Sequence, residues 1–349
     1  MQNPRQMTPQ SQRPRPPREK KGLPSGVWAL LGVVIGFLLP VVACGGLFFL
    51  AVVGASATGG ATPQAAHPPI ATHVRGPLSG PAVAIIPVEG PIVEGRSRGL
   101  EPSTVAAADD IIAMIRAAKH DKSVKAVVLE VNSPGGGIVP SDRIYQALKD
   151  MNKPVVVLMR DLAASGGYYI SMAGDYLYAN PYTLTGSIGV ISTFPNASEL
   201  LKKIGLQMTV VKSGKVKDFG SPYREMTPEE KAYWQHVIDQ AYDHFVKIVA
   251  ENRHLPVGKV RELADGRVYT GTDAKDLGLV DALGYEDDAI AKAADLGHIA
   301  DVPRVIRYEP YTSPLQALLG STAWPGLSLE RAFPWNQALM PSLQYRWLP

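Results

Sequence analysis

The longest apolar run of the chain lies near its amino terminus. From Val27 to Gly54 none of 28 positions carries a charge, and about 20 apolar residues are enough for a helix to cross a bilayer. Pro40 and the pair Gly45-Gly46 interrupt the run, but transmembrane helices tolerate both residue types. The pattern therefore predicts one transmembrane helix over residues 27–54.

Shorter apolar runs follow after residue 80 and alternate between two periods. Ala82–Ile86 and Pro154–Met159 are short, continuous apolar runs, and Val124–Val131 is mostly apolar, which is typical of buried strands. Between them, the stretch from Ser103 to about Lys119 and the stretch that Ser141 opens have apolar positions at helical spacing. Alternating strands and helices predict parallel βαβ units and hence an α/β fold.

Two further elements are predicted in the second half. In the motif Thr227-Pro228-Glu229-Glu230 the threonine can cap a helix, the proline suits the first helical position and the acids complement the helix dipole. This helix is expected to reach about Asn252. The apolar segment Met208–Val211 is predicted to be a strand.

These patterns divide the chain into five parts. They are a disordered basic tail over 1–26, the membrane anchor over 27–54, a linker over 55–80, the α/β domain over 81–307 and a Pro- and Trp-rich arm over 308–349. The first part is rich in Pro, Gln and Arg, and the linker in Ala, Thr, Gly and Pro, which are compositions of unfolded chain. The arm has little periodicity and is interpreted as a tail that lies on a neighbouring surface.

The charge is unevenly distributed. Residues 1–26 carry six basic groups and one acidic group, whereas the remaining 323 residues carry 29 basic and 31 acidic groups. A nucleic-acid-binding domain would not confine its positive charge to a terminal tail, so nucleic acid is not an expected partner. Because the basic block directly precedes the apolar run, the amino terminus is expected in the cytoplasm and the α/β domain outside it.

Three other interpretations of the apolar run fit the sequence less well, and a buried soluble helix fits least at this length. Ala55-Ser56-Ala57 resembles a signal-peptide cleavage site, but the run is longer than the 7–15 apolar residues usual for signal peptides. Val41-Val42-Ala43-Cys44 resembles a lipidation box, but the sequence stays apolar beyond it. An uncleaved signal anchor is therefore favoured. Cys44 is the single cysteine, which excludes an intrachain disulfide and a cysteine-based zinc cluster.

Two glycine-rich turns each follow a predicted strand. Asn132–Gly137 can present backbone N–H groups to an anion or an oxyanion, although the dinucleotide and P-loop patterns are absent. Ala163–Tyr168 places Ser165 between small residues at a predicted helix start. There the hydroxyl can act as a nucleophile or simply cap the helix, and both interpretations remain open.

A serine nucleophile needs a base. His236 and His244 lie at helical spacing on the long polar helix, which gives no support for a Ser–His triad. The alternative base is a lysine whose pKa is lowered by burial. Three candidates follow the predicted strand Met208–Val211, namely Lys212, Lys215 and Lys217. The residues alone do not choose among them.

Four sequence blocks in this order resemble the serine–lysine signal peptide peptidase family, peptidase family S49, which is similar in fold to the Clp protease and crotonase superfamily. The blocks are Asn132-Ser133-Pro134-Gly135-Gly136, Ala164-Ser165-Gly166-Gly167-Tyr168-Tyr169, Thr185-Gly186-Ser187-Ile188-Gly189-Val190 and Lys212-Ser213-Gly214-Lys215-Val216-Lys217-Asp218. The resemblance covers about residues 82–284 and implies a repeated ββα core.

The resemblance also implies a role for each site residue. Ser165 matches the nucleophile, and Lys217, the lysine directly before Asp218, matches the general base. Ser187 resembles the hydroxyl that holds the lysine amine. The backbone N–H groups of Gly136 and Gly166 match the oxyanion donors. Such a site uses no metal and no cofactor.

The family implies a function as well. Its enzymes clear remnant signal peptides from membranes and assemble into rings or domes whose sites are completed between subunits. We therefore expect a single-pass serine endopeptidase of the bacterial cytoplasmic membrane, in the short-chain form, that cuts apolar peptides as a homo-oligomeric ring. Three alternatives remain open: a broader quality-control protease, a catalytically inactive crotonase-like ring scaffold, and an enzyme that transfers acyl groups from a thioester.

Overall fold

The computed structural model describes residues 68–97, 105–311 and 344–346. The predicted basic tail and membrane anchor lie outside these ranges, as do most of the predicted linker and carboxyl-terminal arm. Among the described residues, no helix is both long enough and apolar enough to span a bilayer.

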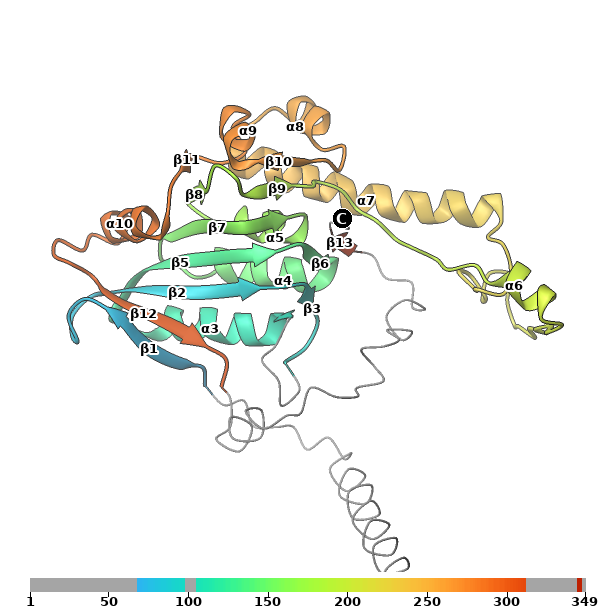
Figure 1. Cartoon of the computed structure of the whole chain (residues 1–349), viewed down its shortest axis with the longest axis horizontal. Coiled ribbons are helices and arrows are strands. Elements are labelled where there is room, and N and C mark those ends of the chain that lie inside the picture. The colour runs from blue at the N-terminus through green and yellow to red at the C-terminus, as the bar shows by residue number, and fades with distance from the viewer. Residues whose placement is uncertain (1–67, 98–104, 312–343, 347–349) are drawn as a thin grey trace, which may run out of the picture. The chain divides into compact units, whose positions relative to one another are not determined.

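A nine-stranded, mainly parallel sheet forms the centre of the domain (Figure 1). Its strand order is β1-β12-β2-β5-β7-β8-β11, with β9 beside β7 and β10 beside β9. The strands are β1 (Ile70–Arg75), β2 (Ala82–Glu89), β5 (Val124–Ser133), β7 (Val155–Ala164), β8 (Tyr176–Ala179), β9 (Leu184–Gly186), β10 (Val268–Thr270), β11 (Ala282–Leu283) and β12 (Arg304–Glu309). The alternation of strands and helices thus correctly predicts a parallel-rich α/β fold.

A small second sheet lies at the carboxyl end of β5. It has the order β13-β6-β3-β4, with β3 (Ile92–Val93), β4 (Ala106–Ala107), β6 (Gly135–Gly137) and β13 (Gln344–Arg346). β3 runs parallel to β4 and β6, whereas β13 runs antiparallel to β6. The first glycine-rich turn of the sequence is therefore itself a short strand.

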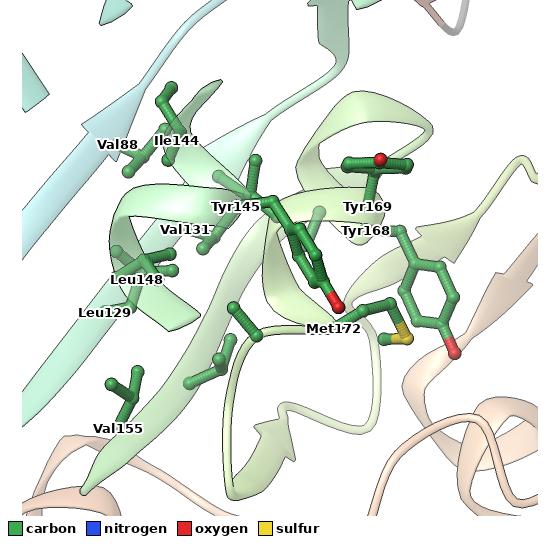
Figure 2. Close-up of a cluster of buried hydrophobic side chains, with 14 of the residues drawn as sticks. Val88, Leu129, Val131, Ile144, Tyr145, Leu148, Val155, Tyr168, Tyr169 and Met172 are labelled. Atoms are coloured by element: carbon green, nitrogen blue, oxygen red, sulfur yellow. The ribbon is translucent and has the colours of Figure 1, made fainter. Parts of the chain in front are cut away.

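Helices cover both faces of the main sheet. One face packs against α3 (Ala108–His120), α4 (Ile138–Lys149), α5 (Gly166–Ser171), α8 (Val257–Leu263) and the second half of α7 (Pro228–Arg253), and Figure 2 shows part of this core. The other face packs against α10 (Glu286–Leu296). Side chains of β5 alternate between the two cores, with Val127 and Leu129 in the first and Val128 in the second. Burial on both faces explains why most positions of this strand are apolar.

Several boundaries differ from the predicted ones. The first long helix begins at Ala108 and not at Ser103, which lies outside the described residues, and the second begins at Ile138, before Ser141. β1 lies within residues 55–80, which the sequence predicts to be a linker. The segment is a strand because it pairs antiparallel with β12. Its partner is more than 200 residues away in the sequence, so local patterning cannot reveal the pairing.

The predicted helix start at residues 227–230 is confirmed. The Thr227 hydroxyl accepts a hydrogen bond from the Glu230 amide, and the Glu230 carboxylate accepts one from the Thr227 amide, which together form a capping box. α7 ends at Arg253, one residue beyond the predicted end. The predicted strand Met208–Val211 is wrong: the segment has no sheet partner and lies in an arm over residues 191–227 (Figure 1).

Tyr168 joins α5 to the rest of the core. Its side chain is fully buried, and its hydroxyl donates to the Leu279 carbonyl at 2.8 Å. Burial raises the pKa of Tyr168 well above its ordinary value, so the phenol stays a donor.

We predict that Tyr168→Phe lowers the free energy of unfolding by about 1–2 kcal/mol, because the buried Leu279 carbonyl loses its donor. Chemical denaturation would measure the loss. The matched control is Tyr182→Phe, since Tyr182 is 87% exposed. Equal stability of the two variants would contradict the prediction.

Candidate active site

Ser165 lies in the sharp turn from β7 into α5. Its backbone has φ 55° and ψ −114°, a conformation that non-glycine residues rarely adopt, and it directly precedes the first residue of α5. Its amide donates to the Gly186 carbonyl at 2.8 Å, which fixes the turn against β9. A strained serine between strand and helix is the geometry of a nucleophile turn.

Ser187 follows β9 and adjoins the same turn. β9 runs parallel to β7 with Ala164 opposite Gly186, so the two serines follow paired positions of neighbouring strands. Ser187 also has a positive φ, 48°, and its amide donates to the Arg267 carbonyl at 2.8 Å. Ser165 and Ser187 are 1% and 6% exposed, and both line one cleft. The structure therefore brings these two predicted residues together.

The two predicted oxyanion glycines meet beside Ser165. A Cβ atom on Gly166 would lie 3.1 Å from the Gly136 nitrogen and 2.7 Å from the Ser141 hydroxyl oxygen. A Cβ atom on Gly136 would lie 1.9 Å from the Ile92 carbonyl oxygen. Only glycine permits contacts this close at both positions. They place the Gly136 amide next to Gly166, the first residue of α5.

The cleft around both serines has a volume of about 510 Å³. Four of its lining residues share one face of α7, and the others come from the segments after β9 and before β10. The α7 residues are Gln235, Ile238, Asp239 and Tyr242, and the others are Gly189, Val190, Ile191, Ala264, Asp265 and Gly266. Sequence reasoning missed the α7 stripe, although its i, i+3, i+4, i+7 spacing could have revealed it.

One carboxylate of the cleft is held in its charged form. Arg267 donates to Asp265 at 2.8 and 2.9 Å through its Nε atom and holds the pKa of that carboxyl below its ordinary value. Asp239 accepts a hydrogen bond from Gln235 at 2.8 Å. Of the described residues that line the cleft, none is a histidine or a lysine.

Lys217 is not among the residues that line this cleft. It lies in a series of turns in the 191–227 arm, where its amide donates to the Gly214 carbonyl at 3.1 Å and its side chain is exposed. Figure 1 shows the part of the arm with α6 (Ser198–Lys203) beyond the amino-terminal end of α7 and away from the sheet. Within one chain, the structure thus gathers Ser165, Ser187, Gly136 and Gly166 but not Lys217.

The chain's own carboxyl-terminal strand covers one edge of the site. β13 pairs antiparallel with β6, with Tyr345 opposite Gly136, and it also contacts α4 and α5. Since β3 occupies the other edge of β6, β13 takes the one remaining edge of the strand that carries Gly136.

Two family models match the chain, and both are models of proteases. The family model of peptidase family S49 matches residues 147–300, and that of Clp protease matches residues 100–184. A Synechocystis protein, named provisionally as a protease, is 45% identical over 188 residues, which are 53% of this chain and 68% of that protein.

Two other relatives give the same indication. A Methanocaldococcus jannaschii protein named provisionally as a protease is 44% identical over 192 residues, 54% of this chain and 61% of that protein. An Enterococcus faecium protein named provisionally as a signal peptide peptidase is 40% identical over 224 residues, 62% of this chain and 65% of that protein. The matches to these two relatives thus span less than two thirds of each.

The strained turn generates a stability prediction. We expect Ser165→Gly to be more stable than Ser165→Ala by roughly 1 kcal/mol, because alanine keeps the strain of the positive φ and glycine relieves it. Thermal or chemical denaturation would measure the difference. At Ser171, in the regular helix α5, the order of the glycine and alanine variants should reverse. Equal stabilities at position 165 would mean that the turn stores no strain.

Proposed function

The chain belongs to peptidase family S49, and on that premise we propose that it is a serine endopeptidase with Ser165 as nucleophile and Lys217 as general base. The observation that carries the proposal is the strained turn of Ser165, which opens into a cleft beside Ser187 and adjoins the glycine turn of Gly136. No other described serine combines a strand-to-helix turn, a positive φ and a glycine turn at its side.

The proposed reaction follows from this arrangement. The neutral Lys217 amine takes the Ser165 proton while the hydroxyl oxygen attacks the peptide carbonyl, and Ser187 holds the amine. The amides of Gly136 and Gly166 bind the oxygen as it becomes negative. Lys217 then gives its proton to the departing amine, and a water molecule activated by the same lysine hydrolyses the acyl-enzyme.

The position of Lys217 favours a site completed between chains. A lysine serves as a base when it is removed from water, yet the Lys217 side chain is exposed in one chain. The same arm also exposes apolar side chains, among them Leu200, Ile204, Val211 and Val216, by 61–95%. Large apolar side chains left exposed in one segment are typical of an interface. We therefore assign the arm to contact with a second copy, in a homo-oligomeric ring.

The cleft and the edge of β6 indicate the type of substrate. Val190, Ile191 and Ile238 give the cleft an apolar side, and an extended peptide can add to a sheet edge through its main chain. An apolar peptide such as a remnant signal peptide fits both features. Together with the anchor predicted over 27–54, they support a single-pass protease of the bacterial cytoplasmic membrane whose catalytic domain lies outside the cytoplasm.

We predict that Ser165→Ala and Lys217→Ala each abolish cleavage of an apolar peptide by the full-length protein, whereas Lys215→Ala does not. Lys215 is a matched control, because it is an exposed arm lysine paired with Glu229. Co-expression of the Ser165→Ala and Lys217→Ala chains should restore part of the activity, since some sites then combine an intact serine with an intact lysine from its neighbour.

The outcomes separate the alternatives. Full activity of both single variants would overturn the Ser–Lys assignment, and mixed oligomers without activity would overturn completion between chains. If the unmutated protein cleaved no peptide, the result would indicate the catalytically inactive ring scaffold. Faster cleavage of polar unfolded proteins than of apolar peptides would favour quality control, and hydrolysis of acyl thioesters without peptide cleavage would indicate acyl transfer.

A substrate strand and β13 would compete for the same edge of β6. We expect proline at Tyr345, or at both Gln344 and Arg346, to weaken the pairing, because proline lacks the N–H that a ladder needs. KM for a peptide should then fall by about twofold or more, since the free edge becomes more populated. The corresponding alanine variants keep the N–H and should change KM less. An unchanged KM in both proline variants would contradict the competition.

A further inference from the structure

Arg224 binds the side chain of Asp218, the residue that follows Lys217. Its Nε donates to Asp218 Oδ2 and its Nη2 to Asp218 Oδ1, both at 2.9 Å. Paired bonds of this kind fix the orientation as well as the distance of a carboxylate. The Asp218 side chain is 11% exposed and that of Arg224 is 31% exposed, so the carboxylate is more shielded from water than the guanidinium.

The same guanidinium also binds the carboxylate of Glu230 in the first turn of α7. Its Nη1 donates to Glu230 Oε2 at 2.8 Å and its Nη2 to Glu230 Oε1 at 2.7 Å. Glu230 is 4% exposed and also accepts the Thr227 amide of the capping box. α7 in turn is held in the core by Phe245 and Val249 near its other end. Arg224 thus connects the turn that carries Lys217 to a helix fixed in the domain.

We propose that Arg224 is a positioning residue that sets the place of Lys217 by clamping Asp218 to Glu230. This inference rests on the proposed role of Lys217 as general base. A lysine that arrives from a mobile turn would meet the nucleophile in many orientations, whereas proton transfer needs one. The clamp confines the backbone of the base through the residue next to it.

The charges around the clamp support a permanent contact. Arg224 holds the pKa of Glu230 at about 2 and that of Asp218 below its ordinary value. Both carboxylates therefore stay charged at any pH at which an amine can act as a base. Lys212 adds one bond to Asp218 at 2.5 Å, and the exposed pair Lys215–Glu229 lies beside the cluster.

A separate contact keeps the arm attached when the clamp is removed. The ring of Phe219 lies 5.2 Å from that of Trp234 on α7, and Phe194 packs edge-on against both at 5.5 Å. These aromatic contacts need no charge. Loss of Arg224 should therefore loosen the turn of Lys217 without detaching the arm.

The test compares Arg224→Met and Arg224→Lys in the full-length protein. We expect Arg224→Met to lower kcat by about tenfold to a hundredfold, as a misplaced catalytic group does, with KM changed by less than about twofold. Arg224→Lys should recover part of kcat, because an ammonium can pair with one carboxylate but cannot bridge both in paired bonds. Gel filtration and thermal denaturation would verify that each variant stays folded and assembled.

Two control variants define the specificity of the effect. Arg75→Met removes an exposed arginine that pairs with Asp287 outside the arm, and it should leave kcat unchanged. Lys212→Met removes one contact of Asp218 but leaves the Arg224 clamp, so its effect on kcat should be smaller than that of Arg224→Met.

A double variant separates positioning from a general structural role. In the Lys217→Ala background, Arg224→Met should not further slow the modification of Ser165 by a fluorophosphonate probe, because the base it places is already absent. A further decrease, or an unchanged kcat in Arg224→Met, would overturn the inference alone. Full activity of Lys217→Ala would instead overturn the proposed base, and the inference with it.

Discussion

The whole site depends on the register of β5 and β7. These parallel strands pair from Val127 opposite Val155 to Val131 opposite Met159, and after an irregularity Ser133 lies opposite Ala163. Their carboxyl ends therefore meet at one edge of the sheet, which is where the chain turns into β6 on one side and into α5 on the other. A Cβ atom on Gly167 would lie 2.7 Å from the Ser133 carbonyl oxygen, so the two turns touch backbone to backbone. A slip of one residue would separate Ser165 from Gly136 and turn the buried side chains of β5 to the wrong face.

The domain combines a rigid core with an arm held at two points. The surroundings of Ser165 come mainly from the two sheets, from α5, from one face of α7 and from the segments after β9 and before β10. The arm leaves this core after β9 and returns at Thr227, and the contacts described above attach it to α7 through one charged and one aromatic group. α7 spans roughly 39 Å at 1.5 Å per residue. Its amino-terminal half can therefore bind the 191–227 arm while its carboxyl-terminal half packs in the core.

Sequence reasoning found the elements whose signals are local. The strands at Val124 and Pro154, the capping box at Thr227 and the turn at Ser165 all follow from neighbouring residues, and the structure has an element at each place. Sequence reasoning failed where a strand depends on a distant partner. β1 is a strand because it pairs with β12, whereas the apolar segment Met208–Val211 has no strand partner and is not a strand. The choice of Lys217 among three lysines came only from the resemblance to a family, because a lysine acquires its role from what it faces in space.

The backbone of Ser165 also restricts which hydroxyl-bearing residue can occupy this turn. Threonine would also offer a hydroxyl oxygen, but a β-branched side chain at φ 55° crowds its own backbone, and such residues are outliers in this region. The fold therefore distinguishes between two hydroxyl-bearing residues before any substrate is bound. A mutation to threonine, often regarded as conservative, would here oppose the geometry of the turn itself. The main chain, as well as the side chain, therefore determines which residue can stand at this position.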